Sequence, residues 1–302
     1  MNKLQIRLKD YFVNLSISFK LWFKNVKQNV FTNKKAMWGL GILLGFLLFS
    51  LFGPLIWPYN PITDENNKFL APSIEHIFGT DNLGRDLFRQ MVYGSRDVLT
   101  IAFFTSVFSV FIGVLLGLLS GLVGGWLDNL IMMIVNLFLT IPSFPIMLIM
   151  ASFFTIEDPF TFALVLSIWS WAGMCRAVRS QIISLRERDF ILICKVENLS
   201  RGHIIFQELL PNIYSYVLIN FIQIMKGAIT SSVGIMMLGL AAFEPSNWGA
   251  ILLRAKDIGA LLIPEATLFW LIPILSIALF QTGAILLVDG LDEALNPRLR
   301  RN

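Results

Sequence analysis

Uncharged apolar runs of about 20 residues divide this sequence, and they constrain its fold more than any other feature. An α-helix needs roughly 20 residues to cross about 30 Å of hydrocarbon at about 1.5 Å per residue. Only 15% of the 302 residues are charged and 56% are hydrophobic, whereas a soluble domain carries about 25% charged residues. A large soluble core would not need an uncharged stretch such as 37–57. The sequence therefore predicts an all-α integral membrane protein.

The apolar runs predict six transmembrane helices, with ends uncertain by several residues. The first is not expected to be a cleaved signal, because a polar stretch precedes it and no small-x-small cleavage site follows. Six crossings place both termini on the same side of the membrane. The predicted spans are 37–57, 98–124, 130–154, 160–174, 213–238 and 268–288.

The distribution of Lys and Arg predicts which side holds the termini. If both termini are cytoplasmic, seventeen of the 24 Lys and Arg residues lie on cytoplasmic segments and six on external segments, while Lys226 lies within a span. We therefore expect both termini in the cytoplasm. The same asymmetry explains the net charge of +4 without a nucleic-acid partner.

No group of reactive residues predicts a metal site or a catalytic centre. Cys175 and Cys194 form no CxxC pair, and His76 and His203 stand alone in the sequence. The predicted spans hold no Ser/His, Asp/Asp or metal-ligand set, which argues against an intramembrane enzyme. A secondary transporter remains the alternative class, although it would usually show paired intramembrane carboxylates or inverted repeats.

Before the first span, apolar residues recur at three- and four-residue spacings between Leu8 and Val30, which indicates one face of a helix. Lys20 and Lys24 lie off that stripe. We expect this helix to lie in the cytoplasmic membrane interface, as an anchor or packed on a partner subunit. The predicted regions are 1–36, this amphipathic helix; 37–97, the first span and an external segment; and 98–302, the core domain.

Two spans carry residues with a packing role. Gly113, Gly117 and Gly121 form a small-xxx-small ladder in the second span, which favours close approach of another helix. Pro142 and Pro145 in the third span remove backbone hydrogen bonds and should kink it.

A loop of about 172–212 is the longest predicted cytoplasmic segment between spans. A helix is predicted to leave the membrane over 176–188, and a second helical stretch covers 188–196. Asn198 suits a left-handed position that ends a helix.

After that turn, Ser200 is expected to cap a short helix over 204–209. We expect this helix to stop at Pro211. A helix, a sharp turn and a short helix make a docking shape for a partner, and an ordinary amphipathic loop packed on lipid headgroups is the alternative.

This loop resembles that of binding-protein-dependent ABC permeases, whose pattern is EAA, three residues, G, nine residues and I-x-L-P. The end of the pattern matches the stretch from Phe206 to Leu210 and Pro211, and Asp189 and Phe190 match an acidic-aromatic pair before EAA. The resemblance implies that the loop docks on an ATPase.

The loop also departs from the family pattern. The family Glu falls on Leu192, the two Ala on Ile193 and Cys194, and the Gly on Asn198. Asn preserves the backbone turn, whereas the loss of the Glu removes an ion pair with the ATPase. The ATPase-coupling residues implied by the resemblance are Asp189, Phe190, Leu192, Asn198, Ser200, Phe206, Leu210 and Pro211.

Other segments resemble the second permease subunit of the dipeptide/oligopeptide/nickel family. Residues 79–86 and 93–96 are similar to its GTDxxGRD…YGxR signature, 246–249 to its SWG segment, and 289–299 to its DGLRDALDPRL segment. Together these matches cover the chain from about residue 75 onward.

The resemblance implies a type I importer permease fold and a non-catalytic subunit of an ATP-driven, binding-protein-dependent importer. Oligopeptides are the expected solute. Oligosaccharides are an alternative, because Ser232 stands where the family often has Glu, and a nickel chelate is another.

The chain has no Walker A loop of its own and is expected to bind no cofactor, with ATP and Mg held by its partners. The implied setting is a bacterial or archaeal cell (inner) membrane, with a homologous second permease, two cytoplasmic ABC ATPases, an extracytoplasmic solute-binding protein and the lipid bilayer as partners.

Two further sets of residues are candidate sites. The external segment 77–97 is predicted to form an amphipathic helix whose charged residues face water or the binding protein. The external-mouth residues are Asp81, Arg85, Asp86 and Arg96.

Lys226 is the clearest intramembrane charge, and its span is the most polar. Placing a charge at mid-bilayer costs about 2.5–3.5 kcal/mol on insertion scales. The predicted pathway-lining residues are Asn220, Gln223, Lys226, Ser231 and Ser232.

Overall fold

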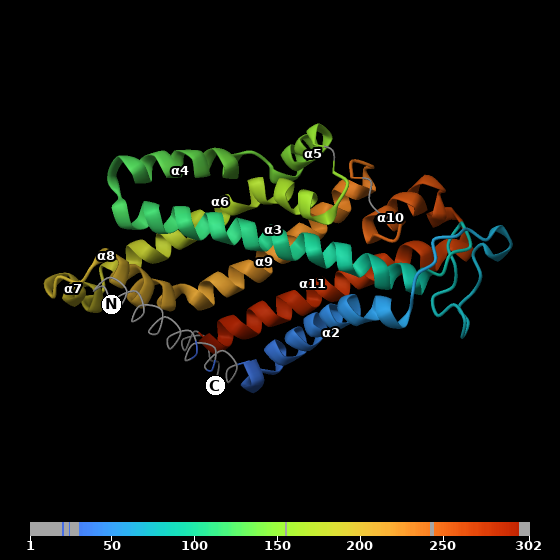
Figure 1. Cartoon of the computed structure of the whole chain (residues 1–302), viewed down its shortest axis with the longest axis horizontal. Helices are drawn as coiled ribbons and strands as arrows, with labels where there is room; N and C mark the ends of the chain where they lie inside the picture. The colour runs from blue at the N-terminus through green and yellow to red at the C-terminus, as the bar shows by residue number, and fades with distance from the viewer. Residues whose placement is uncertain (1–19, 21–23, 25–29, 155, 242–244, 296–302) are drawn as a thin grey trace, which may run out of the picture.

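The computed structural model describes residues 30–154, 156–241 and 245–295, together with Lys20 and Lys24. These residues form an elongated helical bundle (Figure 1). The predicted N-terminal amphipathic helix lies largely outside them, as does the end of the 289–299 match. The α-helices are α2 (Lys34–Ile56), α3 (Leu87–Val123), α4 (Gly125–Thr140), α5 (Ser143–Phe153), α6 (Pro159–Arg186), α7 (Asp189–Val196), α8 (Arg201–His203), α9 (Leu210–Met237), α10 (Trp248–Asp257) and α11 (Thr267–Leu295). The 3-10 helices are η1 (Glu65–Asn67), η3 (Ala260–Leu262) and η4 (Pro264–Ala266), and η2 (Ile204–Leu209) is π-helical.

Five helices of the described chain are long and apolar enough to cross a membrane, and the number rises to six if the bent pair of α4 and α5 counts as one broken span. The two halves of this pair meet at 92°. Ile141 is extended, as expected of a residue before proline, and Pro142 precedes the first turn of α5. The predicted all-α membrane fold is confirmed, five to six candidate spans agree with the predicted six, and the predicted kink in the third span is a full break.

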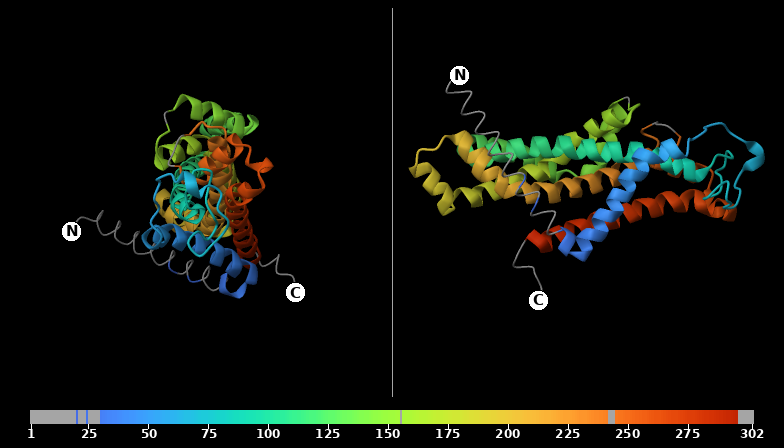
Figure 2. Two further views of the ribbon diagram at one scale, coloured as in Figure 1. Left: turned by 90° about the vertical axis from the view of Figure 1, so that its right-hand side faces the viewer. Right: turned by 60° about the horizontal axis from the view of Figure 1, so that its bottom comes forward.

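The bundle has two distinct ends (Figures 1 and 2). The α7 end carries α7 and α8, and the α10 end carries α10 and the segment between α2 and α3. Lys35 and Glu293 form an ion pair of 2.5 Å, so α2 begins where α11 ends, toward the α7 end. Both ends of the described chain thus lie on one side of the bundle, although the cytoplasmic location of that side remains a prediction.

The pairing of α3 with α6 is the most extensive contact between two helices of the described chain, and the glycine ladder makes it possible. A Cβ on Gly117 would lie 2.7 Å from the carbonyl oxygen of Cys175 and 2.7 Å from the Cβ of Val178. Gly113 and Gly121 approach Met174 and Ile182 of α6 in the same way. The predicted packing role of the ladder is confirmed.

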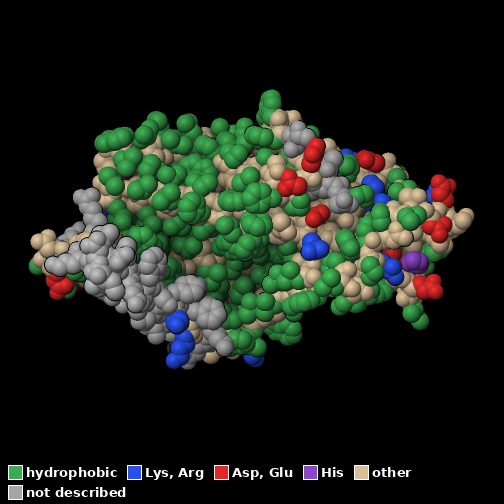
Figure 3. Space-filling model, viewed as in Figure 1, with side chains coloured by type: hydrophobic (Ala, Val, Ile, Leu, Met, Phe, Trp, Pro, Cys, Tyr) green, Lys and Arg blue, Asp and Glu red, His purple; other side chains and the backbone are tan. Residues whose placement is uncertain are grey.

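The surface between the two ends is apolar. Hydrophobic side chains cover most of the face in Figure 3, and charged groups gather toward the α10 end. On α2, exposed side chains include Leu48, Leu51, Phe52 and Leu55. Such a surface suits contact with lipid, which is as apolar as leucine.

Two local predictions about helices are wrong. The helix predicted from residue 77 begins only at Leu87, because Asp86 caps it and the chain before it folds into a turn closed by a Thr80–Asp86 bridge. The helix over 204–209 does not stop at Pro211. The π-helical turn η2 leads directly into α9, and Pro211 occupies the first turn of α9, where a missing N–H costs little.

Candidate functional site: the elbow and the polar face

The segment between α6 and α9 forms an elbow, which we define as residues 187–210. Its turn has the geometry predicted from local residue types. Asn198 has φ of +61°, in the left-handed region, and the N–H of Leu199 donates to the carbonyl of Cys194 at 3.0 Å. This bond closes a Schellman-type end to α7. The backbone N–H of His203 donates to the Ser200 hydroxyl at 3.3 Å, which confirms Ser200 as a cap.

The inner side of the elbow is packed against the ends of two long helices. Ile191 and Leu209 are fully buried in a cluster with Met174, Val178 and Ile182 of α6. Ile213 of α9 belongs to the same cluster. Because apolar cores are close-packed, movement of the elbow must be transmitted to α6 and α9.

The outer side of the elbow is apolar and open. Leu192, Ile193 and Phe206 are about half exposed, and Val196 is 86% exposed. Among the other implied coupling residues, Asp189, Asn198 and Ser200 are exposed, and Phe190, Leu210 and Pro211 are half-buried.

Polar contacts near the elbow tie three helices together. Arg179 of α6 donates two hydrogen bonds to the Asp128 carboxylate of α4, at 2.5 and 2.6 Å. The Ser120 hydroxyl of α3 also donates to Asp128, and Arg186 donates to the carbonyl of Gly121 at 3.1 Å. These contacts were not predicted from the sequence, because their only signal there is an acidic residue at the start of an apolar span.

A buried polar cluster, which we call the clamp, lies at the α10 end and consists of Asp81, Arg85, Gln90 and Arg254. One oxygen of the Asp81 carboxylate accepts from Arg85 Nε and Nη2 and from Gln90 Nε2, at 2.7 to 2.9 Å. Arg254 of α10 donates to the Gln90 side-chain oxygen at 2.9 Å. Burial, followed by the charge of Arg85, lowers the pKa of the Arg254 guanidinium to about 10.

The clamp changes the interpretation of the predicted external mouth. Arg85 was expected to face water, but its side chain is 4% exposed and ion-paired with Asp81, which is fully buried. Asp86 caps α3 and accepts from His76 Nδ1 at 2.8 Å. Of the four residues, Arg96 is exposed.

Two of the segments that resemble the family meet beside the clamp. Gly84 has φ of +75°, and a Cβ there would lie 1.9 Å from the carbonyl oxygen of Asp64, so this tight turn needs glycine. Asn247 caps α10, and the indole N–H of Trp248 donates to the carbonyl of Met91 at 3.0 Å. The signature segments thus build the rigid α10 end.

One side of α9 is lined by polar and small residues. Gln223, Gly227 and Thr230 are exposed, and Asn220, Lys226 and Ser231 are half-buried. Gln281 of α11 donates to the Thr230 hydroxyl at 2.9 Å and to the Lys226 carbonyl at 3.0 Å. Ser232 does not share this side: it is buried, and its hydroxyl donates to the Ile229 carbonyl at 3.0 Å. Its predicted role in lining a pathway is therefore wrong for the chain as folded.

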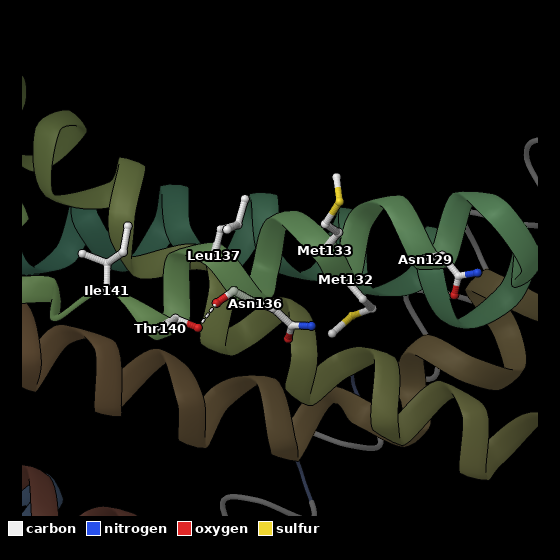
Figure 4. Close-up of a pocket in the computed structure, with 7 residues that line it drawn as sticks. All are labelled: Asn129, Met132, Met133, Asn136, Leu137, Thr140 and Ile141. Atoms are coloured by element: carbon white, nitrogen blue, oxygen red, sulfur yellow. Dashed lines mark hydrogen bonds between the residues drawn. The ribbon is translucent and has the colours of Figure 1, made fainter.

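Exposed polar residues also follow one side of α4, and none of them was among the predicted site residues. Asn129, Asn136 and Thr140 line a depression of about 490 Å³ that ends at Ile141 (Figure 4). Their spacing of seven and four residues is a helical face, and the predicted span 130–154 includes Asn136 and Thr140 but begins one residue after Asn129.

A second cavity, of about 420 Å³, continues this depression because it shares Thr140 and Ile141. It is bounded by the break between α4 and α5, by α6 and by α9, where Gly227 and Ser231 line it. We call the exposed polar residues of α4 and α9, together with this cavity, the polar face.

Comparisons with known proteins agree with this architecture. Residues 113–301 match the family described as "Binding-protein-dependent transport system inner membrane component". The chain belongs to this family. It is therefore a multi-pass inner-membrane subunit of a transport system. Residues 21–72 match a second description, "N-terminal TM domain of oligopeptide transport permease C".

Several relatives are similar over nearly their whole length. The dipeptide transport system permease protein DppC of Alkalihalophilus pseudofirmus is 35% identical over 281 residues, which cover 92% of this chain and 89% of the relative. A putative peptide permease protein of Brucella suis is 32% identical, with 89% of each chain covered. The oligopeptide transport system permease protein OppC of Bacillus subtilis is 30% identical, with 94% of this chain and 92% of the relative covered.

Proposed function

We propose that this chain is one of two homologous permease subunits in an ATP-driven importer that takes peptides from an extracytoplasmic binding protein. The relatives named above are dipeptide, oligopeptide or putative peptide permeases, which supports peptides as the solute class. In this proposal the chain catalyses no reaction. Two cytoplasmic ABC ATPases bind ATP and Mg, and this subunit converts their motion into opening and closing of a path.

The observation that carries the proposal is the elbow. Its inner side is packed against α6 and α9, and its outer side is apolar and exposed. Leu192 and Ile193 stand where the family pattern has Glu and Ala, and together with Val196 they form an exposed hydrophobic surface. We infer that the ATPase binds this surface mainly by burial of apolar area, at about 25 cal/mol per Å². Because this binding needs no ion pair, the absence of the family Glu does not prevent coupling.

Coupling requires the bundle to have two arrangements that nucleotide state can bias. Changing a 1:99 equilibrium to 99:1 takes about 5.5 kcal/mol of differential binding. A docked elbow would transmit that difference through Ile191 and Leu209 to α6 and α9. The polar face, which both helices help to form, is the surface that such a movement would expose or close.

The polar face is incomplete as a path in one chain, since it lies open on one side. A homologous permease facing it would close the path, with polar residues of α4 and α9 in contact with water and solute. Ser232, which suggested a sugar solute, is buried and its hydroxyl donates to the Ile229 carbonyl, so no described contact favours oligosaccharides over peptides.

The test of this function is Val196→Asp, which places a carboxylate on the proposed docking surface. We expect loss of the ATPases during purification of the complex and at least a ten-fold fall in peptide uptake, because a desolvated, unpaired carboxylate opposes docking. Leu262→Asp is a matched control for assembly, since it is equally exposed, at 89%, but lies at the α10 end. If Val196→Asp retains both the ATPases and uptake, the proposed coupling surface is wrong.

A further inference from the structure

Helix α4 is joined to the rest of the chain by two irregular connections. Gly124 and Gly125, where α3 ends and α4 begins, have φ of +68° and +61°, and a Cβ on Gly125 would meet no atom within 4 Å. At its other end α4 stops at Ile141, and α5 leaves at 92°. Hinges in proteins consist of a few such residues, which absorb large changes in φ and ψ. The position of α4 is therefore set by the helices it contacts more than by its neighbours in the chain.

Helix α6 holds α4 by an apolar stripe and by an ion pair. Ile131 and Val135 of α4 are buried in a cluster whose other buried members all belong to α6. Apolar contact is non-directional, so by itself it would let α4 slide or turn on α6. Arg179 adds two parallel hydrogen bonds to the Asp128 carboxylate, at 2.5 and 2.6 Å, and the Asp128 side chain is only 13% exposed. Because a bidentate pair of this kind is geometrically specific, it fixes the register of α4 on α6.

The ion pair lies beside the part of α6 that contacts the elbow. Val178 and Ile182 of α6 are buried in one cluster with Ile191 and Leu209 of the elbow, and Arg179 follows Val178 directly. Figure 1 shows that α4 begins at the end of the bundle that carries α7. Since the backbone hydrogen bonds of a helix hold neighbouring residues in a fixed relation, a displacement of α6 at the elbow also displaces Arg179.

The far part of α4 lines the polar face. Asn129, Asn136 and Thr140 line the depression on its exposed side (Figure 4). Asn136 is also tied to α6, because its side-chain oxygen accepts from Arg176 Nη2 at 2.5 Å. If α4 follows α6, these polar side chains move with it, and the width of the polar face changes.

We propose that Asp128 and Arg179 are coupling residues, which carry the movement of the elbow from α6 to α4. The proposal rests on the peptide-import function proposed above and adds two residues to its machinery. Neither residue binds solute: both are positioning residues that keep the α4 side of the polar face in step with the elbow. Ser120 of α3 also donates to Asp128, so the start of α4 is attached to both helices of the tightly packed α3–α6 pair.

The first test is Asp128→Asn, which keeps the size of the side chain but removes its charge. In the complete complex with its binding protein, reconstituted in vesicles, uptake of radiolabelled trialanine and ATP hydrolysis are measured on one preparation. We expect the ratio of trialanine taken up to ATP hydrolysed to fall at least five-fold, with hydrolysis within two-fold of the unmodified complex. A purely structural pair would lower both rates together as assembled complex is lost, so an unchanged ratio overturns the proposal.

Glu293→Gln is the matched control, because it removes an ion pair with Lys35 that joins α2 to α11 toward the same end of the bundle. Neither of these helices contributes to the cluster at the elbow. The ratio for this variant should stay within two-fold of the unmodified complex, and an equal fall in both variants overturns a specific role of Asp128. If the unmodified complex takes up no trialanine at all, it is the peptide-import function itself that fails.

The second test asks whether α4 and α6 move together. Asp128→Cys combined with Arg179→Cys places one thiol on each helix, while the native Cys175 and Cys194 are buried. A short bismaleimide that joins the two thiols should raise the ratio at least three-fold over N-ethylmaleimide, which blocks them separately, because the link replaces the ion pair. An equal or lower ratio after cross-linking overturns the proposal, since joining the helices would then not restore coupling. Failure to cross-link also overturns it, because the two positions would not be neighbours in the complex.

Discussion

At the scale of single residues, Asp81 has the most demanding environment in the structure. Its carboxylate is fully buried and accepts hydrogen bonds from the backbone N–H groups of Leu83 and Arg85, as well as from the clamp side chains. A buried ion pair is stabilising only when its remaining hydrogen-bonding groups are satisfied. Asp81 meets this condition, and its loss would leave Arg85 buried and unpaired.

We therefore expect Asp81→Ala to lower the free energy of unfolding by about 3–5 kcal/mol. For a chain of this size, that corresponds to a fall of roughly 6–10 °C in the thermal midpoint measured in detergent, at about 2 °C per kcal/mol. Lys68→Ala breaks an exposed pair with Glu65 and should change the midpoint little, since such pairs contribute about 0–1 kcal/mol. Equal midpoints for the two variants would contradict a structural role of the clamp.

At the scale of elements, α3 and α6 form the rigid spine of the bundle, and the broken third span is its irregular neighbour. The spine depends on three glycines that leave no room for a side chain. The broken span depends on Pro142, which ends one helix and begins another at 92°. Both features use residues that are unfavourable inside an ordinary helix, and each contributes something that a regular helix would lack: close contact in one case and a change of direction of 92° in the other.

The spine predicts that Gly117→Val is destabilising, although valine is a better helix former than glycine. The new side chain would force α3 away from Cys175 and Val178, and overpacking of this kind typically costs about 1–3 kcal/mol. Gly41→Val, on the open side of α2, should stay within about 0.5 kcal/mol of the unmodified protein. Thermal unfolding in detergent separates the two cases, and a higher midpoint for Gly117→Val would show that the contact is not tight.

At the scale of the whole molecule, the elbow and the clamp occupy opposite ends of the same bundle (Figure 1). The proposed function requires these ends to face opposite sides of the membrane, with the ATPases at the elbow and the binding protein at the α10 end. The Lys and Arg distribution predicts that the elbow is cytoplasmic. Cysteine accessibility tests that orientation.

We expect Glu187→Cys, at an exposed position of the elbow outside its apolar surface, to react with a membrane-impermeant maleimide only after cells are permeabilised. Ile74→Cys, at a fully exposed position of the α10 end, should react in intact cells. The native cysteines contribute little background because both are buried. The reverse pattern would place the elbow outside the cell and remove the basis of the proposed coupling.

Local chemistry and apolar length were sufficient to predict much of this protein. Six crossings follow from run length, because a helix must span the hydrocarbon whatever its neighbours are. The turn at Asn198 and the cap at Ser200 follow from interactions within a few residues. The kink at Pro142 follows from a missing N–H. Each of these predictions depends on physics that acts within one segment.

The rest was decided by the tertiary structure, because it depends on which helices meet and at what rotation. The residues that follow Arg85 mix polar and apolar types, as in a surface helix. Arg85 is nevertheless buried, because it pairs with Asp81 in the clamp, to which α10 contributes Arg254. Ser232 follows Ser231 in sequence, yet a rotation of about 100° per residue turns one toward the cavity and the other into the core. The cavity is formed by α4, α5, α6 and α9 together, so no single segment could have predicted it.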